Sequence, residues 1–374
     1  MGASSSLLVP RGPESRDACA EYDGKATNPD VGTIQLVRLE AVSPVLPIIS
    51  LDKLGNVREE SVRLREATHD VGFFYLVDHG VPSSLERDLL RVGRELFALP
   101  DADKAAIDMM NSPHFRGFTR LGGERTQGRQ DWREQIDIGA ERPTTTQSEH
   151  AWDILEGPNQ WPAALPELRD VTERWQEQMA AIARRLLHAW AAALEQEETV
   201  FDAAFATSPS TLLKLIRYPA VAPRTRDGQG VGAHKDPGVL TLLWIEPGAG
   251  GLEVQRDSAW IEARPVPGSL VVNIGELLEW ATDGYLRATV HRVLSPTGTH
   301  DRISVPFFFN PALNARIPRL ELPASLRRAA RGVEDDPRNV ITDCFGANLL
   351  KARLRAHPDV AARHHLDMVT SNTA

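Results

Sequence analysis

The sequence predicts a mainly β fold with flanking α-helices, in which the β part forms a closed barrel or a double-sheet jelly roll. From about residue 210 onward, short runs of branched and aromatic residues alternate with glycine and proline, which is typical of all-β barrels and sandwiches. On both sides of that region, apolar residues recur at helical spacing. The expected order along the chain is therefore helical, then β, then helical.

Length and composition limit the possible functions. The chain has 374 residues, of which 42% are hydrophobic, and this is enough for a sizeable core. The formal charge of −9 argues against a nucleic-acid partner, because phosphate binding needs a basic surface. There is no uninterrupted apolar run of about 18 residues and no secretory signal. We therefore expect a cytoplasmic protein without a membrane partner, either a monomer or a weak homo-oligomer.

Two cysteines, Cys19 and Cys344, exclude a disulfide framework and a cysteine-rich zinc site. Residues 1–44 are expected to be a disordered leader or a tag-like segment, since they are rich in small and polar residues, and the letters LVPRG resemble a thrombin-cleavage linker. Three parts are expected to follow: an N-terminal helical and strand region that packs on the core (45–205), the jelly-roll core (206–315) and a C-terminal helical region (316–374).

The N-terminal region is expected to mix short strands with helices. LPIIS, from Leu46, predicts a strand, and REESVRLREATHD predicts a helix that Gly72 ends. The strand FFYLV is stopped by Gly80 and Pro82, and SSLERDLLRVGRELFALP then predicts a helix that starts with a serine cap. A further helix of about 30 residues carries large apolar residues at helical spacing. We assign them to the core: Trp175, Met179, Ile182, Leu186 and Trp190.

The central region is expected to consist almost entirely of strands. They are TLLKLIRYP, GVLTLLWIE, GGLEVQR, AWIEARPVPGSLVVNIG, ATVHRVL and RISVPFFFNP. Helices return at about residues 324–332 and in CFGANLLKARLRAH. The residues with the greatest chemical potential lie in the strand-rich part.

The triplet His234-Lys235-Asp236 suggests a metal site. Side chains alternate along a strand, so His234 and Asp236 point the same way, and His291 from a later strand can complete a three-sided site. Two histidines and one carboxylate on one face form the facial triad of non-haem iron(II) oxygenases, which leaves positions open on the metal. Zinc hydrolases also combine histidine with carboxylate, and chance pairs on exposed strands are common.

The stretch DRISVP supports the oxygenase interpretation. Arg302 lies 11 residues after His291, and Ser304 shares its face of the strand. A guanidinium grips a carboxylate with two parallel hydrogen bonds, and a serine hydroxyl adds a third. The alternative is a solvent-facing Arg-x-Ser pair on an edge strand.

These motifs carry a family resemblance. The chain resembles the isopenicillin N synthase-like branch of the iron(II)/2-oxoglutarate-dependent dioxygenase superfamily through AHKDPGVLTLL, NIGELLEWATDGYLRATVHRV, DRISVPFFFNP, VGFFYLVDHGVP and LFALPDADK. The resemblance runs from about Leu46 to His365 and implies a double-stranded β-helix (jelly-roll) core. It implies that iron is bound by three residues and 2-oxoglutarate by three others. These are His234, Asp236 and His291 for iron, and Arg302, Ser304 and Tyr218 for the cosubstrate.

The implied reaction is the oxidation of a small molecule with dioxygen and 2-oxoglutarate, by hydroxylation, desaturation or cyclisation, in secondary metabolism such as antibiotic biosynthesis. One position departs from the family, since Ile216 stands where an asparagine is common. Two alternatives stay open. One is a ring-forming oxidase of the isopenicillin N synthase type that uses no 2-oxoglutarate, and the other is a non-catalytic cupin-like protein that binds a metal or ligand.

Other polar residues receive structural interpretations. His79 is expected to bond to backbone, and Asn273 and Glu276 are expected to have turn roles. The stretch from Arg116 to Gly139 is rich in arginine and glycine, and most of its arginines are expected to lie on a solvated, charged loop. A mobile cover over the site is the alternative hypothesis for this stretch. Within it Arg116, Phe118 or Arg120 are candidates for contact with an anionic substrate.

Overall fold

The computed structural model describes residues 46–144, 148–220, 229–297, 299–333 and 339–371, with side chains up to residue 368. The predicted leader, residues 1–44, lies outside the described residues. Within these ranges no helix combines the length and the apolar character that crossing a membrane demands.

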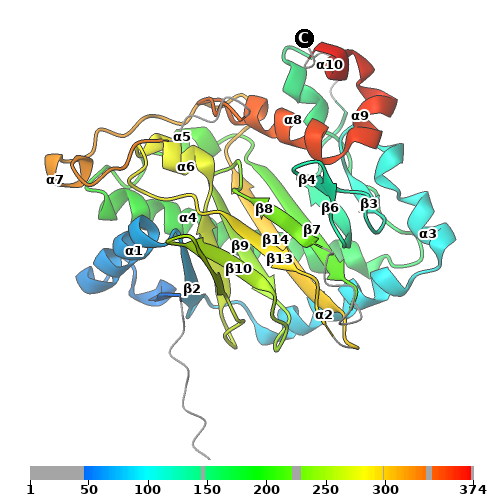
Figure 1. Cartoon of the computed structure of the whole chain (residues 1–374), viewed down its shortest axis with the longest axis horizontal. Helices are drawn as coiled ribbons and strands as arrows, with labels where there is room; N and C mark the ends of the chain where they lie inside the picture. The colour runs from blue at the N-terminus through cyan, green and yellow to red at the C-terminus, as the bar shows by residue number, and fades with distance from the viewer. Residues whose placement is uncertain (1–45, 145–147, 221–228, 298, 334–338, 372–374) are drawn as a thin grey trace, which may run out of the picture. The chain divides into compact units, whose positions relative to one another are not determined.

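Two antiparallel sheets face each other and form the centre of the molecule (Figure 1). The larger has eight strands in the order β1-β2-β12-β9-β14-β7-β6-β3, and only β1 and β2 run parallel. The smaller has four strands in the order β11-β10-β13-β8. The large sheet comprises β1 Ile48–Ser50, β2 Phe73–Val77, β3 Gly117–Thr119, β6 Glu134–Gly139, β7 Ser210–Tyr218, β9 Leu240–Ile245, β12 Leu270–Ile274 and β14 Arg302–Asn310. The small sheet comprises β8 Gln229–His234, β10 Leu252–Arg256, β11 Ala259–Glu262 and β13 His291–Leu294. The predicted class, mainly β with a jelly-roll core and flanking helices, is confirmed.

Alternation of side chains gives the large sheet two different faces, and a separate apolar core lies on each. On β14, Ile303, Val305 and Phe307 join the core under the helices, while the intervening Arg302 and Ser304 point toward the small sheet. A second, smaller apolar core fills part of the space between the sheets, with residues from β2, β7, β8, β9, β10, β12 and β13. The predicted site residues Tyr218, Arg302 and Ser304 lie on this inner side.

Three long helices cover the outer face of the large sheet: α1 Arg58–Asp70, α2 Ser83–Ala98 and α4 Glu167–Ala193. All five apolar residues predicted as the core stripe of α4 are buried, and Trp175 meets Trp244 of β9 edge to face. Each such side chain contributes roughly 1.5–3 kcal/mol through burial. The core assignment is therefore confirmed.

The remaining elements are short or lie near the C-terminus. They are α3 Asp101–Ala106, α5 Asp202–Phe205, α6 Glu276–Ala281, α7 Ala324–Arg327, α8 Phe345–Ala356, α9 Pro358–His364, α10 Leu366–Ser371, the hairpin strands β4 Arg125–Thr126 and β5 Arg129–Gln130, and the 3₁₀ turns η1 Leu51–Lys53, η2 Met109–Asn111 and η3 Ala151–Leu155. The helices α8, α9 and α10, red in Figure 1, lie at the end of the molecule that holds β3, β4 and β6.

Three local predictions were wrong. The helix α2 begins at Ser83 after Pro82, and no side chain caps it, so the predicted serine cap is absent there. The stretch AWIEARPVPGSLVVNIG forms two strands, β11 and β12, because the proline-rich middle cannot continue a ladder. The stretch predicted to be a solvated, charged loop contains four strands, and all six residues of β6 are buried within the large sheet.

Four strands of the large sheet, β1, β2, β3 and β6, come from before residue 206. The N-terminal region therefore supplies part of the same sheet as well as the helices that cover it. The boundaries at 205/206 and 315/316 stay predictions.

Candidate active site

The three predicted metal ligands come together at one end of the small sheet. His291 on β13 lies directly opposite His234 on β8, so the two imidazoles are cross-strand neighbours. One ligand atom from each of His234, Asp236 and His291 lies within 4.8 Å of the other two, and no other such group of three was found among the described residues. The Oδ1 of Asp236 is 3.5 Å from Nε2 of His234 and 3.8 Å from Nε2 of His291.

Asp236 reaches this position from a loop, which corrects the prediction that it shares a strand with His234. The strand β8 ends at His234. The backbone carbonyl of Asp236 then accepts a hydrogen bond from the N–H of Glu276, and that of Gly238 accepts one from Leu277. Gly275 allows this close approach, since a Cβ there would lie 2.1 Å from the Gly238 carbonyl oxygen. The start of α6 thus fixes the loop that carries the carboxylate.

Backbone carbonyls orient both histidines. The Nδ1 of His234 lies 2.8 Å from the Gly232 oxygen, and the Nδ1 of His291 lies 3.0 Å from the Thr289 oxygen. A carbonyl oxygen can only accept, so each Nδ1 carries the proton and each Nε2 keeps its lone pair on the side of Asp236. This tautomer leaves both Nε2 atoms free to bind a metal.

Two side chains of the large sheet hold the other carboxylate oxygen. The Oδ2 of Asp236 accepts hydrogen bonds from Oγ1 of Thr241 at 2.6 Å and from Nδ2 of Asn273 at 2.8 Å. Thr241 and Asn273 are themselves opposite each other on β9 and β12. The turn role predicted for Asn273 is therefore wrong. A signal was present in the sequence, because Asn273 is the one polar residue of the strand LVVNI.

The electrostatics of the triad favour a cation. Burial acts to raise the pKa of Asp236, but the hydrogen bond and charge of His234 and the charge of His291 outweigh it and hold the pKa below its usual range. Burial and the neighbouring His234 lower the pKa of His291 to about 4. Burial opposes protonation of His234 as well, but Asp236 raises its pKa. An ionised carboxylate between imidazole nitrogens suits a divalent metal.

Arg302 lies inside the molecule, which excludes the solvent-facing alternative. It is 1% exposed, and its strand β14 lies between β9 and β7 in the large sheet. Arg302 is opposite Tyr218, its Cζ lies 5.0 Å from the centre of the Tyr218 ring, and Ser304 follows on the same face opposite Ile216. The Nε and Nη1 of Arg302 have no hydrogen-bond partner among the described residues, and burial lowers its pKa.

An unpaired buried guanidinium is costly unless a ligand completes its hydrogen bonds. A planar carboxylate fits such a guanidinium, because it can accept two parallel hydrogen bonds either from Nη1 and Nη2 or from Nε and Nη2. The residues present therefore fit both a divalent metal at the triad and a dicarboxylate whose far end reaches Arg302.

The other polar and aromatic residues named from the sequence make contacts within the protein. The Nδ1 of His79 accepts from the N–H of Val81, as predicted. Glu276 is the first residue of α6, and burial raises the pKa of its carboxyl to about 7. Arg116 and Phe118 are buried, and the Nη2 of Arg116 donates to the Leu155 carbonyl. No contact with a substrate follows from these positions.

The sequence did not reveal a buried network of charges near β6. Lys214 of β7 lies 3.0 Å from Oε1 of Glu124 and 3.4 Å from Oδ2 of Asp137, and Arg353 of α8 lies 2.7 Å from Asp137. Arg133 joins Glu124 at 3.1 Å. These charged residues look like a solvated loop in the sequence, because their partners come from distant segments.

Comparison with known proteins agrees with this geometry. Residues 46–164 match the family described as "non-haem dioxygenase in morphine synthesis N-terminal". Residues 210–311 match the 2OG-Fe(II) oxygenase superfamily. The chain is 34% identical over 336 residues to the 2-oxoglutarate-dependent dioxygenase frbJ of Dothideomycetidae sp., covering 85% of this chain and 91% of that protein. It is 33% identical over 298 residues to validamycin A dioxygenase of Streptomyces hygroscopicus subsp. limoneus, covering 74% and 80%.

A solved structure shows the same fold. A full-length protein of Neurospora crassa, crystallised with alpha-KG (2-oxoglutarate) and thymine, matches with a TM-score of 0.67 at 24% identity, over 84% of this chain and 98% of that one. The family models, the relatives and the triad lead to one conclusion. The chain belongs to the 2OG-Fe(II) oxygenase superfamily and is an Fe(II)- and 2-oxoglutarate-dependent dioxygenase with the N-terminal region of the isopenicillin N synthase-like branch.

Proposed function

We propose that His234, Asp236 and His291 bind the iron, and that Arg302 and Ser304 bind the distal carboxylate of 2-oxoglutarate. Tyr218 contacts the cosubstrate between these two ends. The observation that carries the proposal is the buried Arg302 guanidinium, whose Nε and Nη1 atoms have no hydrogen-bond acceptor among the described residues, opposite Tyr218 in the large sheet. Family membership favours this assignment over the ring-forming oxidase and the non-catalytic protein.

Each part of the chain has a separate task in this proposal. Bound iron(II) supplies the chemistry that activates dioxygen. The triad presents one carboxylate oxygen and two Nε2 lone pairs, and Arg302 fixes the cosubstrate by its far end, which sets the direction of its near end. The apolar residues between the sheets, among them Phe73, which meets His291 edge to face at 5.1 Å, keep water from this space.

We also propose that the substrate is a small molecule of secondary metabolism, such as antibiotic biosynthesis, and that the outcome is hydroxylation, desaturation or cyclisation. The support is the kind of relative found, one of which is named for validamycin A.

The protein is further proposed to work in the cytoplasm as a monomer or weak homo-oligomer, without nucleic-acid or membrane partners. Sedimentation of the purified chain measures its oligomeric state directly.

The test is an anaerobic titration of 2-oxoglutarate into the iron-loaded protein, followed by the metal-to-ligand charge-transfer absorbance. Each charge-assisted hydrogen bond contributes roughly 1.5–3 kcal/mol, so Arg302→Ala is expected to weaken binding by about two to four powers of ten. Arg302→Lys keeps the charge but loses the planar fork, and an intermediate affinity is expected. Equal affinities in wild type and Arg302→Ala would refute the assignment of Arg302.

A further inference from the structure

The strand that carries His234 lies at the edge of its sheet. Among the strands that the structure describes, β8 pairs with β13 alone, in the order β11-β10-β13-β8. An unpaired edge leaves backbone N–H and C=O groups free, and a metal ligand at the end of such a strand has little to fix its position. The segment 125–133, which contains the hairpin strands β4 and β5, covers this edge of β8 and bonds to it.

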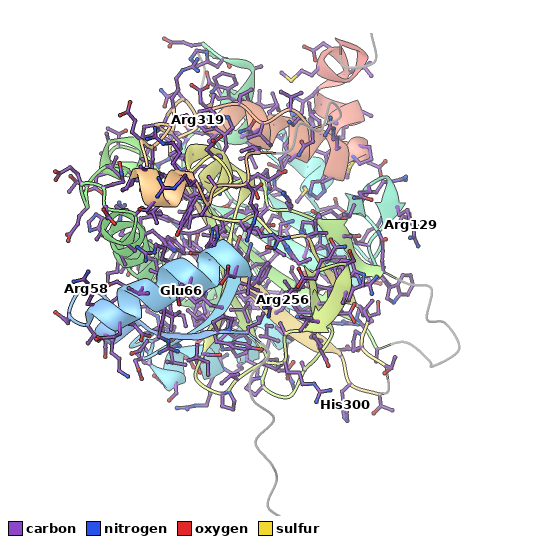
Figure 2. The ribbon with its side chains drawn as sticks, turned by 60° about the vertical axis from the view of Figure 1, so that its left-hand side comes forward. Arg58, Glu66, Arg129, Arg256, His300 and Arg319 are labelled. Atoms are coloured by element: carbon purple, nitrogen blue, oxygen red, sulfur yellow. The ribbon has the colours of Figure 1, made fainter. Side chains whose placement is uncertain are left out.

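Backbone and side-chain hydrogen bonds join the segment 125–133 to β8 along its length. The N–H of Trp132 donates to the Gln229 oxygen at 2.7 Å, and the Nε2 of Gln127 donates to the Ala233 oxygen at 3.0 Å. These bonds lie at the start of β8 and one residue before His234. In Figure 2, Arg129 marks the outer side of the hairpin, where it is exposed.

Asp131 is the centre of this connection. It is fully buried, and its Oδ1 accepts from Nε2 of Gln229 at 3.0 Å and from the N–H of Gly232 at 3.3 Å. Its Oδ2 accepts from Oγ1 of Thr126 at 2.8 Å and from Nη2 of Arg133 at 3.1 Å. One carboxylate thus joins two donors of β8 to two donors of the hairpin segment.

Gly232 transmits this connection to the metal site. Its N–H is held by Asp131, and its carbonyl accepts from Nδ1 of His234. A Cβ on Gly232 would lie 3.0 Å from Thr126, so the hairpin also packs closely against this residue. A shift of Gly232 would therefore turn the imidazole of His234.

We propose that Asp131 is a positioning residue for the metal ligand His234, acting through Gly232. The inference rests on the proposed function, because it requires His234 to bind the metal. Partners of this kind orient a ligand without touching the metal, and their loss typically weakens metal affinity by about ten- to 100-fold. A purely structural role for Asp131 would instead lower the stability of the fold and leave the affinity of the folded protein unchanged.

The matched pair of variants is Asp131→Asn and Glu124→Gln. Both remove one negative charge from a buried side chain, and both side chains contact Arg133. Glu124 bonds to Lys214, whereas Asp131 bonds to β8. The amide that Asp131→Asn introduces must direct its NH₂ either at the donors of β8 or at Thr126 and Arg133, so one half of the connection is lost. Thr126→Val, which removes a single donor, is a milder variant in case Asp131→Asn does not fold.

The experiment titrates Fe(II) anaerobically, and Co(II) by its absorbance, into each metal-free protein, with circular dichroism and thermal unfolding as checks on the fold. Asp131→Asn is expected to bind about ten- to 100-fold more weakly, Thr126→Val less severely, and Glu124→Gln like wild type. The inference is wrong if Asp131→Asn and Thr126→Val both fold and bind the metal with wild-type affinity. It is also wrong if Glu124→Gln loses as much affinity as Asp131→Asn. Absence of metal binding by the wild type overturns the proposed function instead.

Discussion

The two oxygens of the Asp236 carboxylate have different surroundings. The Oδ2 atom accepts hydrogen bonds from Thr241 and Asn273, and the Oδ1 atom faces the Nε2 atoms of His234 and His291. The large sheet therefore holds one oxygen so that the other meets the two imidazoles of the small sheet. The arrangement of the three triad residues therefore includes a contact that joins the two sheets.

Asp236→Ala is expected to abolish iron binding and turnover, because it removes the only anionic ligand atom of the triad. The fold should persist, since neither apolar core includes this side chain. Equilibrium dialysis against Fe(II) and circular dichroism measure the two properties. Glu276→Gln is the control, because its carboxylate accepts from Asn339 and lies outside the triad. Stoichiometric iron in Asp236→Ala would contradict the metal assignment.

Asn273→Ala tests the role of the large sheet in the same site. The change leaves Thr241 as the single side-chain donor to Oδ2 among the described residues, so the carboxylate can turn away from the imidazoles. Metal affinity is expected to fall by about ten- to 100-fold while the fold is retained. A Co(II) titration measures the change, and an affinity equal to that of the wild type would show that Thr241 alone is sufficient.

The metal triad and Arg302 were identifiable from the sequence, whereas the contact between Asn273 and Asp236 was not. His234, Asp236, His291 and Arg302 combine distinctive residue types with distinctive spacing, so a motif reveals them. Asn273 has no such neighbour in the sequence, and its partner Asp236 becomes visible only when β12 is placed beside β9.

At the scale of elements, β6 shows why a buried strand can be mistaken for a loop. Its residues EQIDIG follow an arginine-rich stretch, and charge usually indicates solvent. Here Asp137 pairs with Lys214 of β7 and Arg353 of α8, so the charge is neutralised by segments that are far away in the sequence. Periodicity alone identified α4, because its apolar stripe needs no distant partner.

Arg353→Ala is expected to detach α8 from β6. Among the described residues, the change leaves the fully buried Asp137 with Lys214 as its one ion-pair partner instead of two. Breaking a buried ion pair costs about 3–5 kcal/mol. Urea unfolding measures the free energy of unfolding. Arg363→Ala, at an exposed position of the neighbouring helix α9, is the control and should cost far less. Similar losses in the two variants would count against the Arg353–Asp137 pair.

His357 gives α8 a dependence on pH. Burial lowers its pKa to about 4, and its Nε2 accepts from Arg353, so the ring is neutral in the folded state. The charged groups facing it are Glu124, Asp137, Lys214 and Arg353. The unfolded chain takes up this proton near pH 6.5 and the folded chain only near pH 4, so stability is complete above the first value and falls as pH decreases toward the second.

The expected loss across this window is on the order of 3 kcal/mol, from about 1.4 kcal/mol for each pKa unit. His357→Gln keeps an acceptor for Arg353 but cannot be protonated. Urea unfolding of the metal-free proteins at about pH 7.5 and about pH 4.5 spans most of this window. The free energy of unfolding should therefore differ less between the two pH values in His357→Gln than in the wild type. Identical pH dependence in the two proteins would assign the acid sensitivity to other groups.

At the scale of the whole molecule, the site joins the two sheets. His234 and His291 come from the small sheet, whereas Asn273, Arg302 and Ser304 come from the large one. The sequence predicted strands and their faces, but the strand order, with β12 between β2 and β9, depends on long-range pairing that no local pattern encodes. A ligand that contacts both sheets is therefore expected to stabilise their packing against each other.

Because the site has residues from both sheets, we expect iron and 2-oxoglutarate to stabilise the folded protein in two separate steps. A ligand that binds only the folded state adds about 2.7 kcal/mol at a concentration of about 100 times its Kd. Iron(II) alone should raise the midpoint of thermal unfolding, and 2-oxoglutarate added anaerobically should raise it again. In Arg302→Ala the first step should remain, because the triad is unchanged, and the second should disappear at the same 2-oxoglutarate concentration. Calorimetry under nitrogen separates the two steps. A second step of wild-type size in Arg302→Ala would mean that 2-oxoglutarate stabilises the protein without the guanidinium, and the assignment of Arg302 to the cosubstrate would be wrong.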